Sequence, residues 1–227
     1  MTYKTELHCH TWEVSKCGKA SAEETANYYA GLGYSTVVLT EHFNKNTWKN
    51  PLFAEYNPDL WEDRIRFFMT GVKKLEEAAA GRFHVLLGCE FRMLNNPSDF
   101  QLYGVTGEFL LSHPELPDLS IKELSPLVRE AGILLVQAHP FRDGQQIAKP
   151  ELLDGIEVWN SNLSKDERND IAEMWAERYG LIKTSGTDYH CPKPDREPAG
   201  IVTDFPIESN EQLLATLRGG NYSLIKH

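Results

Sequence analysis

Histidine and acidic residues recur in this sequence directly after short apolar runs. His8 and His10 alternate in ELHCHT, and Asp188 and His190 alternate in SGTDYH. In an extended chain, residues i and i+2 point to the same face, so each pair can offer two side chains to one ion. Imidazole and carboxylate groups bind divalent ions such as zinc, manganese and iron. The two pairs therefore predict metal ligation at two separate points of the chain.

Three further potential ligands follow apolar runs in the same way. His42 ends VVLTEH, Glu90 ends LLGCE, and His139 lies in LVQAHP. The carboxyl ends of parallel strands meet on one face of an α/β barrel, where active sites are built. A single histidine at a strand end is more often a hydrogen-bonded structural residue, but the joint pattern favours a metal centre. We expect one cluster composed of His8, His10, His42, Glu90, His139, Asp188 and His190.

The elements that position these residues are short apolar runs alternating with amphipathic segments. Strands are expected at Thr5–Leu7, Ser35–Thr40, Phe83–Gly88, Gln101–Val105, Ile133–Gln137, Gly155–Trp159, Leu181–Ser185, Ala199–Thr203 and Tyr222–Ile225. Helices are expected at Ser21–Leu32, Asp59–Ala80, Ser120–Glu130, Lys165–Tyr179 and Asn210–Arg218. This alternation predicts parallel strands with crossover helices. The sequence thus predicts one α/β domain over residues 1–227, folded as a barrel, with the polar-aromatic segment 43–57 as a lid or substrate wall.

Composition excludes several classes of partner. The 227 residues carry 33 acidic and 23 basic side chains, for a net charge of −10, which argues against a nucleic-acid-binding surface. No apolar stretch approaches the roughly 20 residues that span a bilayer. The N-terminus lacks the pattern of a signal peptide, and the four cysteines show no CxxC spacing. We expect a cytoplasmic protein with reduced thiols, and the sequence leaves its oligomeric state open.

The five motifs together resemble the polymerase-and-histidinol-phosphatase (PHP) family of metal-dependent phosphoesterases. The resemblance runs over nearly the whole chain, from ELHCHT through VVLTEH, LLGCE and LVQAHP to SGTDYH. It implies a distorted (β/α)7 TIM-like barrel that binds two or three divalent ions, as manganese, iron or zinc. By the family pattern, the first ion is held by His8, His10, Glu90 and Asp188. Glu90 then bridges to a second ion with His139, and His42 and His190 hold the third.

Two positions depart from the family pattern. An Asp or His commonly follows HxH, whereas this loop reads TWEVSKCG, so Glu13 or Cys17 takes that place. We expect Glu13, because a carboxylate suits a hard, hydrolytic ion better, and a thiolate at Cys17 is the alternative. In DFQLYGV, Gln101 stands where a histidine ligand is common. Occupancy of the second metal site therefore stays open.

The resemblance implies hydrolysis of a small phosphate monoester, similar to histidinol phosphate or a nucleotide, by a metal-activated hydroxide. Arg92 and Arg142 lie close in sequence to expected ligands and are our candidates for holding the phosphate. His42 or His190 could protonate the leaving group. Glu41 should point away from His42 and act from behind the ligands or structurally. The alternatives are an amidohydrolase-type amide or lactone hydrolase, which generally has a bridging lysine, and a non-catalytic PHP module.

Overall fold

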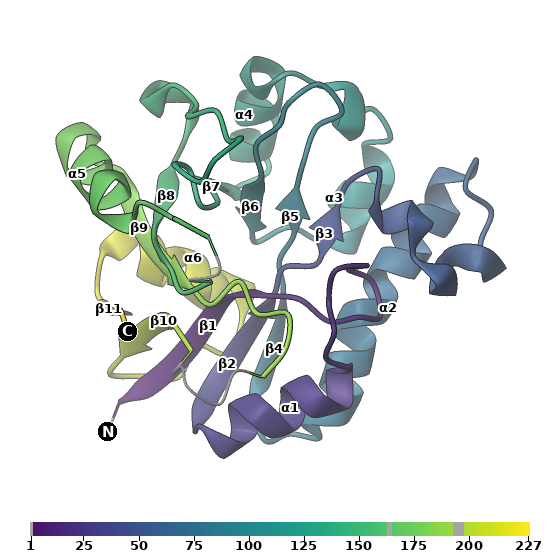
Figure 1. Cartoon of the computed structure of the whole chain (residues 1–227), viewed down its shortest axis with the longest axis horizontal. Helices are drawn as coiled ribbons and strands as arrows, with labels where there is room; N and C mark the ends of the chain where they lie inside the picture. Colours follow the sequence, from purple (N-terminus) through teal and green to yellow (C-terminus); the bar gives the residue numbers. More distant parts are fainter. Residues whose placement is uncertain (1, 163–164, 193–197) are drawn as a thin grey trace.

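Two β-sheets occupy the middle of the protein, and helices lie around them (Figure 1). The computed structural model describes residues 2–162, 165–192 and 198–227. The first sheet has the strand order β11-β10-β1-β2-β4. Its strands are β1 (Tyr3–Cys9), β2 (Tyr34–Leu39), β4 (His84–Leu87), β10 (Gly200–Thr203) and β11 (Ser223–Ile225).

The second sheet has the order β3-β5-β6-β7-β8-β9. Its strands are β3 (His42–Phe43), β5 (Glu90–Phe91), β6 (Phe100–Tyr103), β7 (Leu134–Gln137), β8 (Gly155–Asn160) and β9 (Ile182–Gly186). Four strand pairs are antiparallel, namely β1–β10, β10–β11, β5–β6 and β6–β7. The expectation of parallel strands throughout is therefore wrong. Segments 92–99 and 104–133 join the ends of β6 to its neighbours without a right-handed crossover, which only parallel pairs need.

The two sheets approach each other where the metal-ligand motifs lie. Gly88 N donates to Leu39 O (2.9 Å) and Glu90 N donates to Glu41 O (3.0 Å), so β3 and β5 continue the pairing of β2 and β4. The end of β1 forms an isolated parallel bridge with Tyr189, just after β9. The strands thus form a mixed α/β arrangement in two sheets, and closure into a (β/α)7 barrel remains a prediction.

Six α-helices occur among the described residues: α1 (Ala22–Gly31), α2 (Trp61–Ala79), α3 (Gly107–Ser112), α4 (Ile121–Glu130), α5 (Asn169–Tyr179) and α6 (Asn210–Gly219). The expected helix starts at Ser21 and Ser120 are confirmed as N-caps, each with a capping box. The expected start of α5 at Lys165 is wrong, because the helix begins at Asn169. No periodic pattern predicts the short elements β3, β5 and α3, because they have too few residues to show one.

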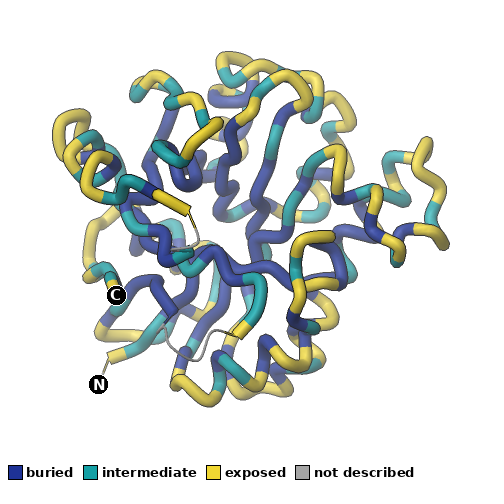
Figure 2. Tube along the Cα trace, viewed as in Figure 1, coloured by how far each residue is buried: buried dark blue, intermediate teal, exposed yellow. Residues whose placement is uncertain are grey.

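The core lies between the strands and the helices, and Figure 2 shows buried strands surrounded by exposed helix faces and loop tips. Segment 43–57 contains two short 3-10 helices, η1 (Thr47–Lys49) and η2 (Pro51–Glu55). Phe43 and Phe53 of this segment are buried, and Trp48 and Tyr56 pack against the same core cluster. These aromatic side chains therefore anchor the segment to the core. Among the described residues, no helix has both the length and the apolar character needed to cross a bilayer.

Candidate metal centre

The expected ligands meet at the carboxyl ends of five strands. His8 is near the end of β1, and His10 follows it. His42 and Glu90 lie three residues beyond the ends of β2 and β4, where the short strands β3 and β5 begin. The remaining ligands lie in the turns after β7 and β9. The structure brings together all seven residues of the expected cluster, and their donor atoms form overlapping groups in which every pair lies within 4.8 Å. The groups are His8–His10–Asp188, His8–Glu90–His139, His10–His42–His190 and His42–Glu90–Asp99.

The carboxylate of Glu90 lies at the middle of the cluster and is fully buried. Its Oε1 is 2.9 Å from His139 Nε2 and 3.4 Å from His8 Nε2. Its Oε2 is 2.6 Å from His42 Nδ1 and 3.3 Å from His10 Nε2. Burial alone would raise the pKa of Glu90, but the charges of His42 and His8 hold it well below its usual value. A carboxylate placed in this way can bridge two ions.

His8 is oriented from behind by Glu157 on β8. His8 Nδ1 lies 2.8 Å from Glu157 Oε1, which leaves Nε2 facing Glu90 and Asp188. The second oxygen of Glu157 accepts from the backbone N–H of His139 and from the side-chain amide of Asn160, both at 2.9 Å. A carboxylate behind a histidine fixes its tautomer and ring orientation, as is usual in metal sites. Burial lowers the pKa of His8, but the carboxylates of Glu157, Asp188 and Glu90 raise it well above its usual value.

Asp188 closes the cluster on the side of β9. Its Oδ1 is 3.5 Å from His8 Nε2 and 3.4 Å from His10 Nε2, and its Oδ2 accepts from Arg142 at 2.6 Å. Arg142 also donates to Glu167 at 2.7 Å. Asp188 and His139 have φ values of 50° and 29°, in the left-handed region that L-residues rarely adopt. Such strain at two clustered residues is typical of functional sites.

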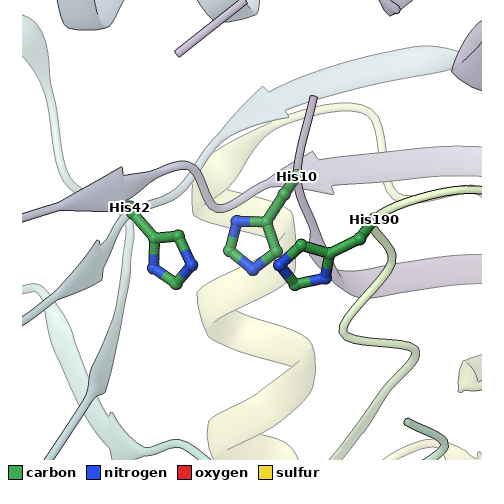
Figure 3. A group of neighbouring side chains, drawn as sticks. All are labelled: His10, His42 and His190. Atoms are coloured by element: carbon green, nitrogen blue, oxygen red, sulfur yellow. The ribbon is translucent and has the colours of Figure 1, made fainter. Parts of the chain in front are cut away.

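Three imidazoles lie side by side at the outer edge of the cluster. Figure 3 shows His10, His42 and His190 projecting from three different segments toward a common space. The ring centroid of His10 lies 4.3 Å from that of His42 and 4.7 Å from that of His190. Cys17 Sγ is 3.1 Å from His190 Nε2. Burial opposes ionisation of the thiol, but its contacts with His190 and His42 lower the pKa of Cys17 to about 6.

Glu13 is placed away from the cluster, and our preference for it over Cys17 needs correction. Both of its carboxylate oxygens accept from the backbone N–H of Ala22, at 2.9 and 3.1 Å. Ala22 is the first residue of α1, so Glu13 accepts a hydrogen bond from an N–H that has no partner within the helix. A negative charge is favourable at a helix N-terminus. Cys17, the alternative residue of the same loop, is the one that approaches the imidazoles.

Asp99 was not singled out from the sequence, although it belongs to one of the ligand groups. It directly precedes β6, two residues before Gln101, and its Oδ2 is 3.9 Å from His139 Nε2. Its carboxylate accepts from Arg92 Nε at 2.6 Å and pairs with the same guanidinium through Nη2. The signal that could have found it is its position at the start of a strand beside Gln101. Gln101 itself pairs in register with Glu90, and both polar atoms of its side chain are buried without a hydrogen-bond partner.

Buried polar atoms without partners suit a cation at this place. Nε2 of His8, Nε2 of His10, Nδ1 of His42 and Oε2 of Glu90 are buried, and although they approach one another or Glu90 to 2.6–3.4 Å, none of them makes a hydrogen bond of good geometry. Each such atom costs about 1–3 kcal/mol when it is left unsatisfied. A divalent ion among them would satisfy these atoms together, and the mixed imidazole and carboxylate donors are those of zinc, iron and manganese sites. The residues present therefore fit divalent ions.

A pocket of about 500 Å³ opens beside the cluster. It is lined by Lys16, Cys17, His42, Asn44, Asn46, Thr47, Lys49 and Arg92. None of these lining residues is acidic, in a chain whose net charge is −10. The pocket therefore presents cations and amides next to the candidate metal ligands, and the segment expected as a substrate wall supplies four of its lining residues.

Solved structures of other proteins share the mixed α/β fold of this chain. No family model matches the sequence, and no curated protein matches it. PsfC from Pseudomonas syringae has a similar structure, with a TM-score of 0.63 and 15% identity over 94% of this chain and 88% of PsfC.

Two further solved structures each superpose with a TM-score of 0.57 and 16% identity. One is a protein from Bifidobacterium adolescentis named as a candidate metal-dependent phosphoesterase, with coverage of 95% of this chain and 96% of that one. The other is an amidohydrolase from Chromobacterium violaceum, solved with bound sulfate and no metal, with coverage of 97% and 98%. At these identities the likeness concerns the fold. The buried His, Glu and Asp cluster has the residues to bind divalent metal ions.

Proposed function

We propose that this protein is a metal-dependent phosphoesterase that hydrolyses a small phosphate monoester. The observation that carries the proposal is the buried Glu90 carboxylate, which faces the imidazoles of four histidines beside a pocket edged with cations. The PHP-like motif order and the fold shared with a candidate metal-dependent phosphoesterase support it.

The charge balance of the site favours an anionic substrate. The ligand groups contain five histidines, which bind metal as neutral imidazoles, and three carboxylates, those of Glu90, Asp188 and Asp99, of which Asp99 is already paired with Arg92. Two or three divalent ions would leave an excess of positive charge, and they would activate water and stabilise negative charge on the phosphate oxygens. Lys16, Lys49 and Arg92 extend this positive field into the pocket. A phosphate dianion is attracted to such a field, whereas a neutral amide or lactone gains little from it.

The positions of the two arginines suggest different tasks. The side chain of Arg92 is 36% exposed and lines the pocket, so it can reach a substrate phosphate while Asp99 holds it in place. The side chain of Arg142 is 11% exposed and bound to both Asp188 and Glu167. Arg142 is therefore better placed to orient the Asp188 carboxylate. It could contact a substrate phosphate only where that phosphate lies against Asp188.

His42 and His190 are the imidazoles of the cluster that solvent reaches. Their side chains are 19% and 21% exposed, whereas those of His8 and His10 are fully buried. His42 also lines the pocket. Either residue could pass a proton to the leaving group, and His42 is nearer to the space where a leaving group would lie.

An amidohydrolase activity is the second candidate, because the solved amidohydrolase superposes as well as the candidate phosphoesterase. No lysine is buried among the described residues, and the carboxylate that faces the imidazoles of four histidines is that of Glu90. A substrate with an amide or lactone bond would therefore have to be hydrolysed without a bridging lysine.

The proposal is tested by assaying p-nitrophenyl phosphate hydrolysis by the purified protein, loaded with manganese, iron or zinc, beside Asp188→Asn. Asparagine tolerates a positive φ, so this variant removes the charge without adding backbone strain. We expect phosphatase activity in the wild type and a loss of about 100-fold or more in the variant. Hydrolysis of lactone or amide probes, with no hydrolysis of phosphate esters under any metal, would contradict the proposal and support the second candidate.

A further inference from the structure

Cys17 lies at the edge of the cluster, in a loop that is held in place by several hydrogen bonds and close contacts. The loop between β1 and α1 folds back so that the backbone N–H groups of Lys19 and Ala20 both donate to the carbonyl of His190, at 2.8 and 3.0 Å. Gly18 packs against Thr11 so closely that an added Cβ would lie 2.6 Å from the Thr11 carbonyl carbon. The residues that directly follow the thiol are therefore held against the backbone of His190 and of Thr11.

Glu41 fastens the same loop from the other side. Its carboxylate accepts from the backbone N–H of Thr11 (3.0 Å) and of Ser15 (3.2 Å), and from the hydroxyl groups of both residues. The Ser15 hydroxyl oxygen in turn accepts from the backbone N–H of His42 at 2.9 Å. The loop that carries Cys17 is thus connected by direct hydrogen bonds to the backbone of His42 and of His190.

The tautomer of His190 shows which atom faces the sulfur. His190 Nδ1 is 2.8 Å from the backbone carbonyl of Asp188. A carbonyl oxygen only accepts, so Nδ1 carries the proton, and in the neutral imidazole the lone pair is on Nε2. Nε2 is the atom that lies 3.1 Å from Cys17 Sγ. In neutral His190, the nitrogen that carries the lone pair and the Cys17 sulfur therefore lie side by side, as two ligands of one ion do.

A second, independent observation points to the same space. Nε2 of His10 is fully buried and makes no hydrogen bond, and a ring nitrogen of His10 lies within 4.8 Å of ring nitrogens of His42 and His190. For a zinc ion with sulfur at 2.3 Å and nitrogen at 2.0–2.1 Å in tetrahedral geometry, the donor atoms are about 3.5 Å apart. Cys17 Sγ and His190 Nε2, at 3.1 Å, are already close to this value, and the ring nitrogens of His10, His42 and His190 lie within 4.8 Å of one another.

We propose that the Cys17 thiolate is a metal ligand, and that together with His42 and His190 it forms a subsite for a thiophilic divalent ion. With the ion bound, the sulfur would carry one negative charge, and a thiol still protonated would release its proton to solvent. Three protein ligands leave an open coordination position, which is the arrangement of a catalytic rather than a structural zinc site. His10 Nε2 lies between this subsite and Asp188 Oδ1, at 3.4 Å from the latter, and can face one ion only.

If Cys17 is a ligand, the two sides of the cluster should prefer different metal ions. Thiolate ligands favour zinc, iron and cobalt, whereas carboxylates also suit manganese and magnesium. Glu90 and Asp188 supply the carboxylates on the inner side of the cluster, and Cys17 supplies the sulfur on its outer side. We therefore expect a mixed occupancy, with the softer ion next to the pocket. This inference rests on the metal centre of the proposed function and does not depend on the bond that the enzyme hydrolyses.

Cobalt(II) substitution tests the proposal directly, because a cobalt–thiolate bond gives a charge-transfer absorption in the near ultraviolet that nitrogen and oxygen ligands do not give. The metal-free protein is titrated with cobalt(II), beside Cys17→Ser, Cys17→Asp and the matched control Cys191→Ser. We expect the band in the wild type and in the control, and its absence in both Cys17 variants. Cys17→Asp should still bind cobalt(II), shown by its visible bands, and its preference for zinc over manganese should fall by about tenfold or more.

A second readout is the reactivity of the thiol toward iodoacetamide, read by mass spectrometry of the peptide that contains Cys17. Zinc should protect Cys17 from alkylation and leave the partly exposed Cys191 unprotected. A band that is missing from the cobalt-loaded wild type, or that persists in Cys17→Ser, overturns the proposal. Protein that binds cobalt(II) through the thiolate but hydrolyses no phosphate ester would overturn the proposed function and leave the Cys17 ligand standing.

Discussion

Glu157 shows how a residue outside the ligand set can control the metal centre. It touches the ring of His8 with one oxygen, and the backbone of His139 with the other. It thereby fixes two ligands that come from different strands. Gly186, on the adjacent strand β9, has no room for a side chain, since an added Cβ would lie 2.4 Å from His8 Cβ and 2.6 Å from Glu157 Oε1. The orientation of His8 is therefore fixed by contacts on two sides.

Glu157→Gln should weaken metal binding by about 10–100-fold. A glutamine has one acceptor oxygen, so it cannot accept from His8 Nδ1 and, at the same time, from the His139 backbone and the Asn160 amide. The measurement is the dissociation constant for zinc by competition with a chromophoric chelator. Glu130→Gln, on the exposed end of α4, is the matched control and should bind zinc as the wild type does. Equal affinities of the two variants would show that Glu157 does not position the ligands.

Lys49 lies in the pocket at a distance from the ligand groups, so its substitution should affect substrate binding more than chemistry. Lys49→Ala should raise KM for an anionic phosphate ester by roughly threefold to tenfold, while kcat changes little, as expected for the loss of uniform binding. Lys73→Ala, on the exposed face of α2, serves as the control. A fall in kcat with an unchanged KM would contradict a role in substrate binding.

At the scale of elements, the strand ends explain why so much of the site could be predicted. The motifs containing His8, Glu90 and Asp188 are recognisable because each follows an apolar run, and the pairing of strands brings the runs together. Antiparallel pairs such as β6–β7 could not be read in the same way, since a short buried strand has the same apolar pattern in either direction. The choice between Glu13 and Cys17 depended on the course of one loop, and loop geometry is set by contacts with distant residues such as Glu41.

Gly18→Ala tests the importance of that loop. The added methyl group would meet backbone atoms of Thr11 and Trp12 at 2.6–2.8 Å, which cannot be relieved by a side-chain rotation. We expect a loss of about 1–3 kcal/mol in the free energy of unfolding, measured in urea, and a loss of zinc protection of Cys17. Gly31→Ala is the control, because an added Cβ there meets nothing within 4 Å. Equal stability and equal protection in the two variants would show that the loop adapts without effect on the site.

At the scale of the whole molecule, the metal centre joins segments that are far apart in the sequence. Its ligands come from both sheets, and the buried carboxylates would repel one another without imidazolium ions or metal between them. Bound ions should therefore stabilise the whole fold. An ion present at a thousand times its dissociation constant contributes about 4 kcal/mol, which for a domain of this size corresponds to roughly 8–16 °C in Tm. Removal of metal with a chelator should lower Tm by this amount in differential scanning calorimetry, and an unchanged Tm would contradict a structural link through the ions.

Metal binding should also depend steeply on pH. In the metal-free protein, burial opposes protonation of His8, but the carboxylates of Glu157, Asp188 and Glu90 raise its pKa well above the usual value. The raised pKa means that a proton must leave His8 when an ion binds, so the apparent affinity falls as pH decreases. We expect a loss that approaches about tenfold per pH unit between pH 8 and pH 6 for each proton displaced. An affinity that is constant over this range would show that the imidazoles are not the ligands.

The central claim is that the cluster around Glu90 binds several divalent ions, and counting the ions tests it most directly. The protein is purified without chelator, reconstituted separately with manganese, iron and zinc, and measured by elemental analysis beside Glu90→Gln. We predict two or three ions per chain in the wild type and at least one fewer in the variant, because Glu90 faces ligands of more than one group. Fewer than about one ion in ten chains after every reconstitution, or the same count in the variant as in the wild type, would contradict the account.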